Sequence, residues 1–260
     1  MAGFFFLTSS YTYVPEVKMN ETNTLEVEMN FEDYVSFFYN KLSPNYTKPE
    51  FGVFKQAITG FFVLKAKEKV RNNLLTIIDF SLSGNDERMW IIDMDKMKIV
   101  HLSLVSHGKN SGELYANKFS NITSSYQSSL GFYTTGDIYT GKHGMSLYLD
   151  GVERGINDNA RERAIVIHSA DYVSKDFIAK NGRLGRSQGC PAIPVEYHKK
   201  VISLISGGSC LYIYHPQETY HSNTEMLGQE IALAGMIKFF DELPGILAVV
   251  PALPSSENPI

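Results

Sequence analysis

Cysteine is scarce in this chain of 260 residues, in which only Cys190 and Cys210 occur. Two cysteines do not form the multi-bridge framework of a small disulfide-rich protein. They show no CxxC spacing, and the seven histidines show no HxH or HxxxH spacing that would bring two metal ligands together. The sequence therefore predicts no metal site.

Long apolar runs and an excess of positive charge are also missing. No stretch of about 18 apolar residues occurs, so we expect no membrane-spanning helix. Lys and Arg total 24 against 28 Asp and Glu, and the net charge of -4 argues against nucleic-acid binding. The opening stretch MAGFFFLTSS lacks the basic start and the long apolar run of an intact signal peptide.

The patterning that is present predicts an α+β protein that is mainly β. Hydrophobic residues make up 43% of the chain and aromatic residues 12%, which is typical of a globular protein with a β-rich core. Residues 29–70 show helical periodicity, with Asn30 as the predicted N-cap. Short β-prone runs follow, namely LLTIIDFSL, RMWIIDM, KIVHLSLVSHG, MSLYLDG, RAIVIHS and CLYIYHP, with a short helix in PVEYHKKVISLISGG before the last.

We divide the chain into three parts. Residues 1–28 form an N-terminal tail, residues 29–216 form the main domain, and residues 217–260 form a C-terminal extension. The extension begins with TEMLGQEIALAGMIKFF, which predicts an amphipathic helix, and it ends in a Pro-rich apolar stretch. Two interpretations of the extension stay open: packing back on the domain, or contact with a partner, a membrane surface or a second copy of the chain.

Cys190 lies in GRLGRSQGCPAIP, a polar and glycine-rich segment in which a thiol is poorly buried. Glycines there allow backbone N–H groups to turn toward a developing oxyanion. Arg183 and Arg186 supply a cationic flank that lowers a thiol pKa or holds a substrate carboxylate. Cys190 is therefore the predicted nucleophile, whereas Cys210, in the strand-like GSCLYIYHP, is predicted to be a buried structural thiol.

A cysteine nucleophile generally needs a base, and His168 is the best-placed histidine. It ends the apolar run RAIVIH, where a buried strand meets a loop. His107 begins a stretch, residues 107–160, that is rich in Gly, Ser, Asn and Thr and predicts loops around a site, and His143 lies within it in TGKHGMS. Without the cysteine, each of these histidines is also compatible with a structural role.

The segment IHSADYVSKDFIAKNGRLGRSQGCPAIP resembles the catalytic motif of the YkuD-like L,D-transpeptidases, in which a strand ends in His and Ser-x-Gly-Cys precedes a helix. The upstream stretches HGKNSG, FSN, SSLGFYTTG and GKHGMSLYLDG resemble a divergent branch of murein L,D-transpeptidase catalytic domain proteins, so the resemblance covers about residues 50–216. It implies a β-sandwich-like catalytic domain with an N-terminal helical segment and short peripheral helices. It also implies that no metal and no organic cofactor takes part.

The resemblance further implies a reaction. Cys190 attacks a peptidoglycan stem tetrapeptide, releases the terminal D-Ala, and passes the acyl group from a thioester to an amine of another stem. If water takes the acyl group instead, the enzyme is an L,D-carboxypeptidase. A catalytically inactive wall-binding or interaction protein is a further interpretation, against which the presence of both Cys190 and His168 argues. Peptidoglycan stem peptides are the implied partner, and the implied location is periplasmic or otherwise extracytoplasmic.

The same resemblance implies roles for individual residues. His168 takes the thiol proton and is oriented by a backbone carbonyl, while Ser187 supports the loop or the histidine. The backbone N–H groups of Gly189 and Cys190 are the expected oxyanion donors. The residues expected to bind substrate are Arg186, Arg183, Tyr172, His143, Lys142 and His107.

Three positions depart from the common family motif. Ser169 stands where the motif has Gly after the histidine, and Gln188 replaces the second His of Ser-His-Gly-Cys. Ala192 replaces the usual Arg two residues after the cysteine. We expect Arg186, Lys142 or His143 to supply the carboxylate contact that this arginine provides elsewhere.

Overall fold

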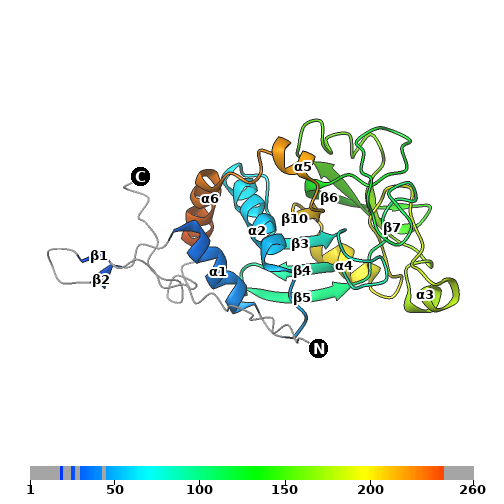
Figure 1. The fold of residues 1–260 in the computed structure, drawn as a ribbon, viewed down its shortest axis with the longest axis horizontal. Helices are drawn as coiled ribbons and strands as arrows, with labels where there is room; N and C mark the ends of the chain where they lie inside the picture. Colours follow the sequence, from blue (N-terminus) through cyan, green and yellow to red (C-terminus); the bar gives the residue numbers. More distant parts are fainter. Residues whose placement is uncertain (1–17, 20–24, 27–29, 43–44, 243–260) are drawn as a thin grey trace, which may run out of the picture.

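The computed structural model describes residues 18–19, 25–26, 30–42 and 45–242 (Figure 1). The predicted N-terminal tail over 1–28 lies almost entirely outside the described residues, and so does the Pro-rich end of the C-terminal extension. Within the described residues, none of the helices has the length and apolar character needed to cross a membrane.

Eight strands form one continuous ladder in the order β5-β4-β3-β10-β6-β7-β8-β9. The pairs β3–β10 and β8–β9 are parallel, and the other pairs in this ladder are antiparallel. The strands are β3 (Leu74–Asp79), β4 (Met89–Asp93), β5 (Lys98–Ser103), β6 (Gly131–Gly141), β7 (Gly144–Gly151), β8 (Val166–Ser169), β9 (Ala192–Ile193) and β10 (Cys210–Tyr214), with a separate pair β1 (Lys18–Met19) and β2 (Leu25–Glu26). The predicted fold class, an α+β domain with N-terminal helices and short peripheral helices, is confirmed.

The N-terminal helices are α1 (Phe31–Lys41) and α2 (Phe51–Ala66). The Asn30 side chain accepts a hydrogen bond from the Asp33 amide at 3.1 Å, and the Asp33 carboxylate accepts one from the Asn30 amide at 2.8 Å. This reciprocal capping box satisfies two amides that the first helical turn leaves without partners, so Asn30 is the N-cap as predicted.

The predicted amphipathic helix of the C-terminal extension is α6 (Gln229–Asp241), which lies beside α1 and α2 at one end of the molecule (Figure 1). Gly235 of α6 meets the backbone of α2 so closely that a Cβ there would collide with the carbonyl oxygen of Phe62. Phe239 adds edge-to-face contacts to Phe61 and Phe62, with ring centroids 5.9 and 5.7 Å apart. This part of the extension therefore packs on the domain.

The described residues contain three shorter helices, namely α3 (Lys175–Asn181), α4 (His198–Ile205) and α5 (Glu218–Asn223).

We expected loops over residues 107–160, which are rich in Gly, Ser, Asn and Thr. This stretch contains one long strand, β6, in addition to the expected strand β7. The two form a hairpin in which the ladder shifts register between Thr135 and Ile138. Phe132 of β6 stacks on Tyr212 of β10 with 4.1 Å between ring centroids, and this burial stabilises a strand that its glycines disfavour. Cys210 of β10 is a free cysteine and is completely buried, as predicted.

Candidate functional site

The parallel pairing of β8 with β9 brings the predicted base close to the predicted nucleophile. His168 of β8 is the register partner of Ala192 of β9, and Cys190 lies two residues before Ala192. The Ser106 amide donates to the Ala192 carbonyl at 2.9 Å and supports β9 from its other side. Residues far apart in the sequence thus meet at one edge of the sheet.

Ser187 fixes the shape of the loop that carries Cys190, which we call the nucleophile loop (residues 187–190). Its hydroxyl donates to the Cys190 carbonyl at 2.6 Å and accepts from the Gly189 amide at 3.0 Å. Its backbone is held as well, because the Ser187 amide donates to the His107 carbonyl at 2.9 Å and its carbonyl accepts from the Lys109 amide at 2.8 Å. A single side chain therefore closes a tight turn around the predicted nucleophile.

Gly189 has a backbone conformation that requires glycine. Its φ is +120°, and a Cβ there would lie 2.8 Å from the Gln127 carbonyl oxygen. The Gly189 amide is bonded to Ser187 within the loop, so it does not face an incoming carbonyl in this state. Among the described residues, the Cys190 amide has no hydrogen-bond partner and is the better oxyanion donor of the two.

The Cys190 thiol is protonated at neutral pH. Its Sγ–H donates to the Ala164 carbonyl at 3.6 Å. Burial raises the pKa of the Cys190 thiol, while the Val166 amide and the Arg163 and Lys142 charges lower it in part. Because the net direction is upward, a neighbouring base is needed to generate the thiolate.

His168 has the features of such a base. Its side chain is almost fully buried, and Nδ1–H donates to the Ser169 carbonyl at 2.9 Å. A carbonyl oxygen only accepts, so the proton is on Nδ1 and the Nε2 lone pair is available. Burial lowers the pKa of His168, and the His143 and Lys142 charges lower it further. His168 is therefore neutral at pH 7 and able to accept a proton.

Cys190 and His168 open on the same pocket of about 530 Å³. Five more of the predicted site residues line it, namely Ser187, Arg186, Tyr172, His143 and Lys142. The pocket also has polar and aromatic lining from the loops before β6 and β8, including Ser124, Tyr126 and Arg163. It has the mixed character of a cavity for a polar peptide-sized ligand.

Two of the predicted substrate-binding residues do not line this pocket. His107 is buried, with its Nδ1 accepting from Arg88 at 2.8 Å and its Nε2 facing the Gly112 carbonyl at 3.3 Å. Arg183 pairs with Glu113, with 3.1 Å between Nε and Oε2. Both residues lie in the shell of side chains that supports the nucleophile loop, so their direct contact with substrate stays a prediction.

Arg186 lines the pocket, but its guanidinium is already engaged. Nη1 donates to the Lys109 and Gly112 carbonyls at 3.0 Å each, and it pairs with Glu113 at 2.7 Å. The exposed Glu113 carboxylate is therefore the anion that this guanidinium holds in the structure.

Sequence reasoning missed Arg163, which organises the wall of the pocket opposite the nucleophile loop. Its two Nη groups donate to the Ser120 and Gln127 carbonyls, at 2.7 and 2.6 Å, and contact two serine hydroxyls. Ala164 follows it with φ of +53°, and the carbonyl of Ala164 holds the Cys190 thiol. The only sequence signal here is an arginine before an apolar strand, and no spacing rule singles it out.

Within the part of the chain that the structure describes, no group of three or more His, Cys, Asp or Glu side chains is arranged to hold a metal ion. The pocket offers a thiol, a neutral imidazole and cationic side chains, together with a free backbone amide. This set is suited to acyl transfer through a covalent intermediate.

Solved structures of three known proteins are similar to parts of this chain. An L,D-transpeptidase from Mycobacterium smegmatis is 12% identical, with 55% of this chain and 59% of that protein covered and a TM-score of 0.34. An L,D-transpeptidase from Mycobacterium tuberculosis is 11% identical, with coverage of 55% and 58% and a TM-score of 0.36. The helical cell shape determining protein Pgp2 from Campylobacter jejuni is 12% identical, with coverage of 70% and 64% and a TM-score of 0.36.

This chain thus spans less than two thirds of the length of these solved proteins. No curated protein matches its sequence. The match to the family model described as L,D-transpeptidase catalytic domain covers residues 46–214, well over half of the chain and all of the pocket. The chain therefore belongs to the L,D-transpeptidase catalytic domain family.

Proposed function

We propose that this protein is a cysteine acyl-transferase that acts on peptidoglycan stem tetrapeptides. The observation that carries the proposal is the meeting of Cys190 with His168 in one pocket, the imidazole being held by a backbone carbonyl with Nε2 free. Family membership over residues 46–214 supports the substrate class.

In the first half of the proposed reaction, His168 Nε2 takes the proton from Cys190 Sγ as the sulfur attacks the carbonyl carbon of the third stem residue. The negative charge that develops on the carbonyl oxygen is stabilised by the Cys190 N–H. The C–N bond to the terminal D-Ala then breaks. The proton on His168 passes to the leaving amine, and a thioester remains on Cys190.

In the second half, the side-chain amine of another stem attacks the thioester carbonyl, and His168 takes a proton from that amine. The C–S bond breaks, an amide forms between the two stems, and the proton returns to the sulfur. Arg186 is suited to hold a free stem carboxylate once Glu113 is displaced. Lys142 and His143, in the turn between β6 and β7, line the same pocket.

Because peptidoglycan lies outside the cytoplasmic membrane, this proposal requires an extracytoplasmic location, in the periplasm or at the cell wall. The alternative in which water replaces the amine gives an L,D-carboxypeptidase with the same acyl-enzyme. An inactive wall-binding protein would bind the stem without forming a thioester.

The test is to mix the full chain with a purified disaccharide-tetrapeptide and to follow protein and products by mass spectrometry. We expect an adduct that peptide mapping assigns to Cys190, loss of D-Ala, and a cross-linked dimer. Cys190→Ala should abolish the adduct, and His168→Ala should slow it by at least about a hundredfold. His198→Ala, at a histidine on α4 outside the pocket, is the matched control.

The products distinguish the alternatives. A tripeptide with no dimer identifies the carboxypeptidase. If a folded protein with a titratable Cys190 thiol binds the tetrapeptide but gives neither adduct nor product, the wall-binding interpretation replaces the transferase.

A further inference from the structure

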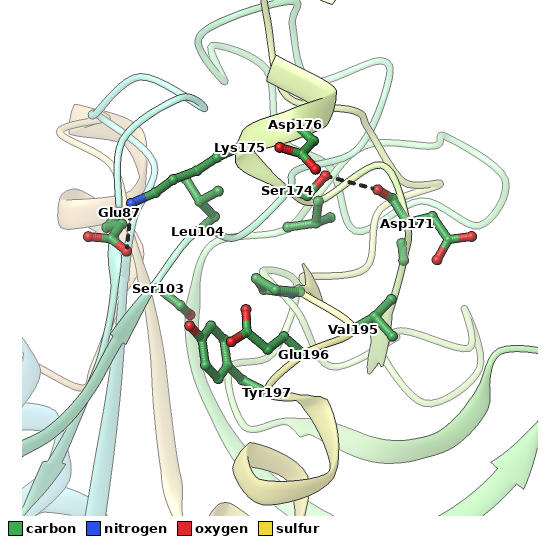
Figure 2. Close-up of a pocket in the computed structure, with 13 residues that line it drawn as sticks. Glu87, Ser103, Leu104, Asp171, Ser174, Lys175, Asp176, Val195, Glu196 and Tyr197 are labelled. Atoms are coloured by element: carbon green, nitrogen blue, oxygen red, sulfur yellow. Dashed lines mark hydrogen bonds and ion pairs between the residues drawn. The ribbon is translucent and has the colours of Figure 1, made fainter. Parts of the chain in front are cut away.

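A second pocket, of about 460 Å³, opens between the end of β5, the start of α3 and the segment after β9 (Figure 2). Its apolar lining includes Leu104 and Val173, which belong to a small buried cluster separate from the main core. Ala170, Asp171 and Val173 line this pocket, whereas Tyr172 between them lines the catalytic pocket. The two pockets are therefore distinct and share one wall.

The charge around this second pocket is strongly unbalanced. Its lining holds a single cation, Lys175, and four carboxylates, those of Glu87, Asp171, Asp176 and Glu196. Lys175 extends along the rim toward Glu87, with 3.9 Å between Nζ and Oε1, while the Glu196 carboxylate points into the pocket (Figure 2). Glu196 also meets the exposed Tyr197 hydroxyl, but a carboxylate has about four acceptor sites, so others remain for a ligand.

A buried hydroxyl gives independent evidence of a missing ligand. Ser103, only 2% exposed, is the last residue of β5, and its side chain is turned toward the pocket (Figure 2). Its Oγ has no hydrogen-bond partner among the described residues. Buried polar groups are satisfied in most native structures, so an unpaired hydroxyl beside a cavity indicates a site for a polar atom. His101 lies two residues earlier in β5, and its Nε2 also has no partner among the described residues. Its ring packs against that of Tyr197, with 5.4 Å between the ring centroids.

We propose that this pocket binds a primary alkylammonium group, with its N–H bonds directed to Ser103 Oγ and the Glu196 carboxylate and its methylenes on the Leu104 and Val173 side chains. An ammonium has three donors and no acceptor, which matches an unpaired hydroxyl next to a carboxylate. A bare metal ion is a poorer fit, because no three or more His, Cys, Asp or Glu side chains among the described residues, those of this pocket included, are arranged to hold one. The ligand reaches Ser103 by displacing the ring of Tyr197, which is 39% exposed.

The same chemistry occurs in a free diamine and in a lysine-like side chain of a peptide. The test therefore titrates the full chain with 1,5-diaminopentane and, separately, with Nα-acetyl-lysine amide, and follows binding by calorimetry and by amide chemical shifts. The neutral control ligand is 1,5-pentanediol. Binding by the diamine alone identifies a free polyamine as the ligand, and binding by both identifies the amine group wherever it is carried.

The variants distinguish specific binding in the pocket from a general attraction of cations to acidic side chains. Ser103→Ala changes no charge and should weaken diamine binding about fivefold, because one hydrogen bond to a charged donor is lost. Glu196→Gln should weaken it by about the same factor, and Lys175→Gln should strengthen it about twofold, because the competing cation is removed. Glu225→Gln, at an exposed carboxylate outside the pocket, is the matched control.

The proposal is overturned if neither amine binds, if 1,5-pentanediol binds as well as the diamine, or if Ser103→Ala leaves the affinity unchanged. The site does not depend on the proposed acyl transfer, because binding is measured in Cys190→Ala as well as in the unsubstituted chain. If amine binding fails, the proposed acyl transfer is unaffected, and if acyl transfer fails, the amine site is unaffected.

Discussion

The rings of His143 and His168 stack in the pocket that Cys190 also lines, with 4.4 Å between their centroids and 22° between their planes. His143 lies in the turn that joins β6 to β7, so the tip of this hairpin covers the proposed base. Burial is the main cause that lowers the pKa of His168, and the His143 charge is a further one. The hairpin therefore contributes to the environment of the proposed base and helps to lower its pKa.

Replacing His143 by Ala should raise the pKa of His168 toward its ordinary value, because the substitution exposes the ring and removes a neighbouring positive charge. A base must be deprotonated to act, so the acid limb of the kcat/KM profile should move to higher pH. The measurement is kcat/KM for D-Ala release against pH. His198→Ala should leave the profile unchanged, and an acid limb that stays in place in His143→Ala would show that the stack does not tune the base.

Ser187→Ala should damage catalysis more than substrate binding. The substitution removes the bonds from Oγ to the Cys190 carbonyl and from the Gly189 amide to Oγ, so the nucleophile loop loses its internal brace. We expect kcat to fall by about tenfold to a hundredfold with a small change in KM. The free energy of unfolding should fall by about 1 to 2 kcal/mol. Steady-state kinetics measure kcat and KM, and urea unfolding measures the free energy of unfolding. An unchanged kcat would mean that catalysis does not need the two Ser187 hydrogen bonds.

Cys190 and His168 could be singled out as the candidate nucleophile and base because a local sequence pattern marks each of them. His168 ends an apolar run that becomes β8, and Cys190 sits among glycines that the loop requires, as the φ of +120° at Gly189 shows. What brings them together could not be predicted, since β9 has only two residues and no propensity reveals its parallel pairing with β8.

The sequence was less informative where a role depends on a distant partner. His107 has the position of a site residue at the end of a strand-like run, but Arg88, 19 residues earlier, holds it inside the structure. Arg88 follows a run of polar residues and has the pattern of a surface arginine, yet it is completely buried. Only the tertiary structure shows that Arg88 and His107 form a buried supporting pair and are not exposed for ligand binding.

His107 should make the protein sensitive to acid. Burial and the nearby Arg88 charge lower the pKa of His107 from 6.5 to about 4. As pH falls through this window, the unfolded chain takes up a proton that the folded chain does not. The free energy of unfolding should therefore drop by about 3 kcal/mol between pH 7 and pH 4 from this group alone.

His107→Gln keeps an acceptor for Arg88 but cannot titrate, so its unfolding free energy should vary less with pH. Urea unfolding at pH 7, 5.5 and 4 gives the comparison, with His198→Gln as control. If the pH dependence stays the same while KM for the tetrapeptide rises, His107 contacts the substrate instead.

Arg163 should promote ionisation of Cys190. Its charge lowers a thiol pKa that burial raises, so Arg163→Gln should raise that pKa further and move the midpoint of iodoacetamide alkylation to higher pH. Arg163→Lys retains a charge and should shift the midpoint less. Arg161→Gln is the matched control, because Arg161 pairs with Asp150 at the surface. Equal shifts in the Gln and Lys variants would assign the effect to the loop that Arg163 holds and not to its charge.

Glu113→Gln should improve substrate binding if Arg186 holds a stem carboxylate. Glu113 pairs with Arg186 at 2.7 Å and is itself 70% exposed, so it competes with an incoming anion for the same guanidinium. Removing the competing charge should lower KM for the tetrapeptide by about twofold to fivefold with kcat unchanged, and Arg186→Gln should raise KM. Glu225→Gln serves as control. A higher KM in Glu113→Gln would instead mean that the carboxylate holds Arg186 in position, and the carboxylate contact would then have to come from Lys142 or His143.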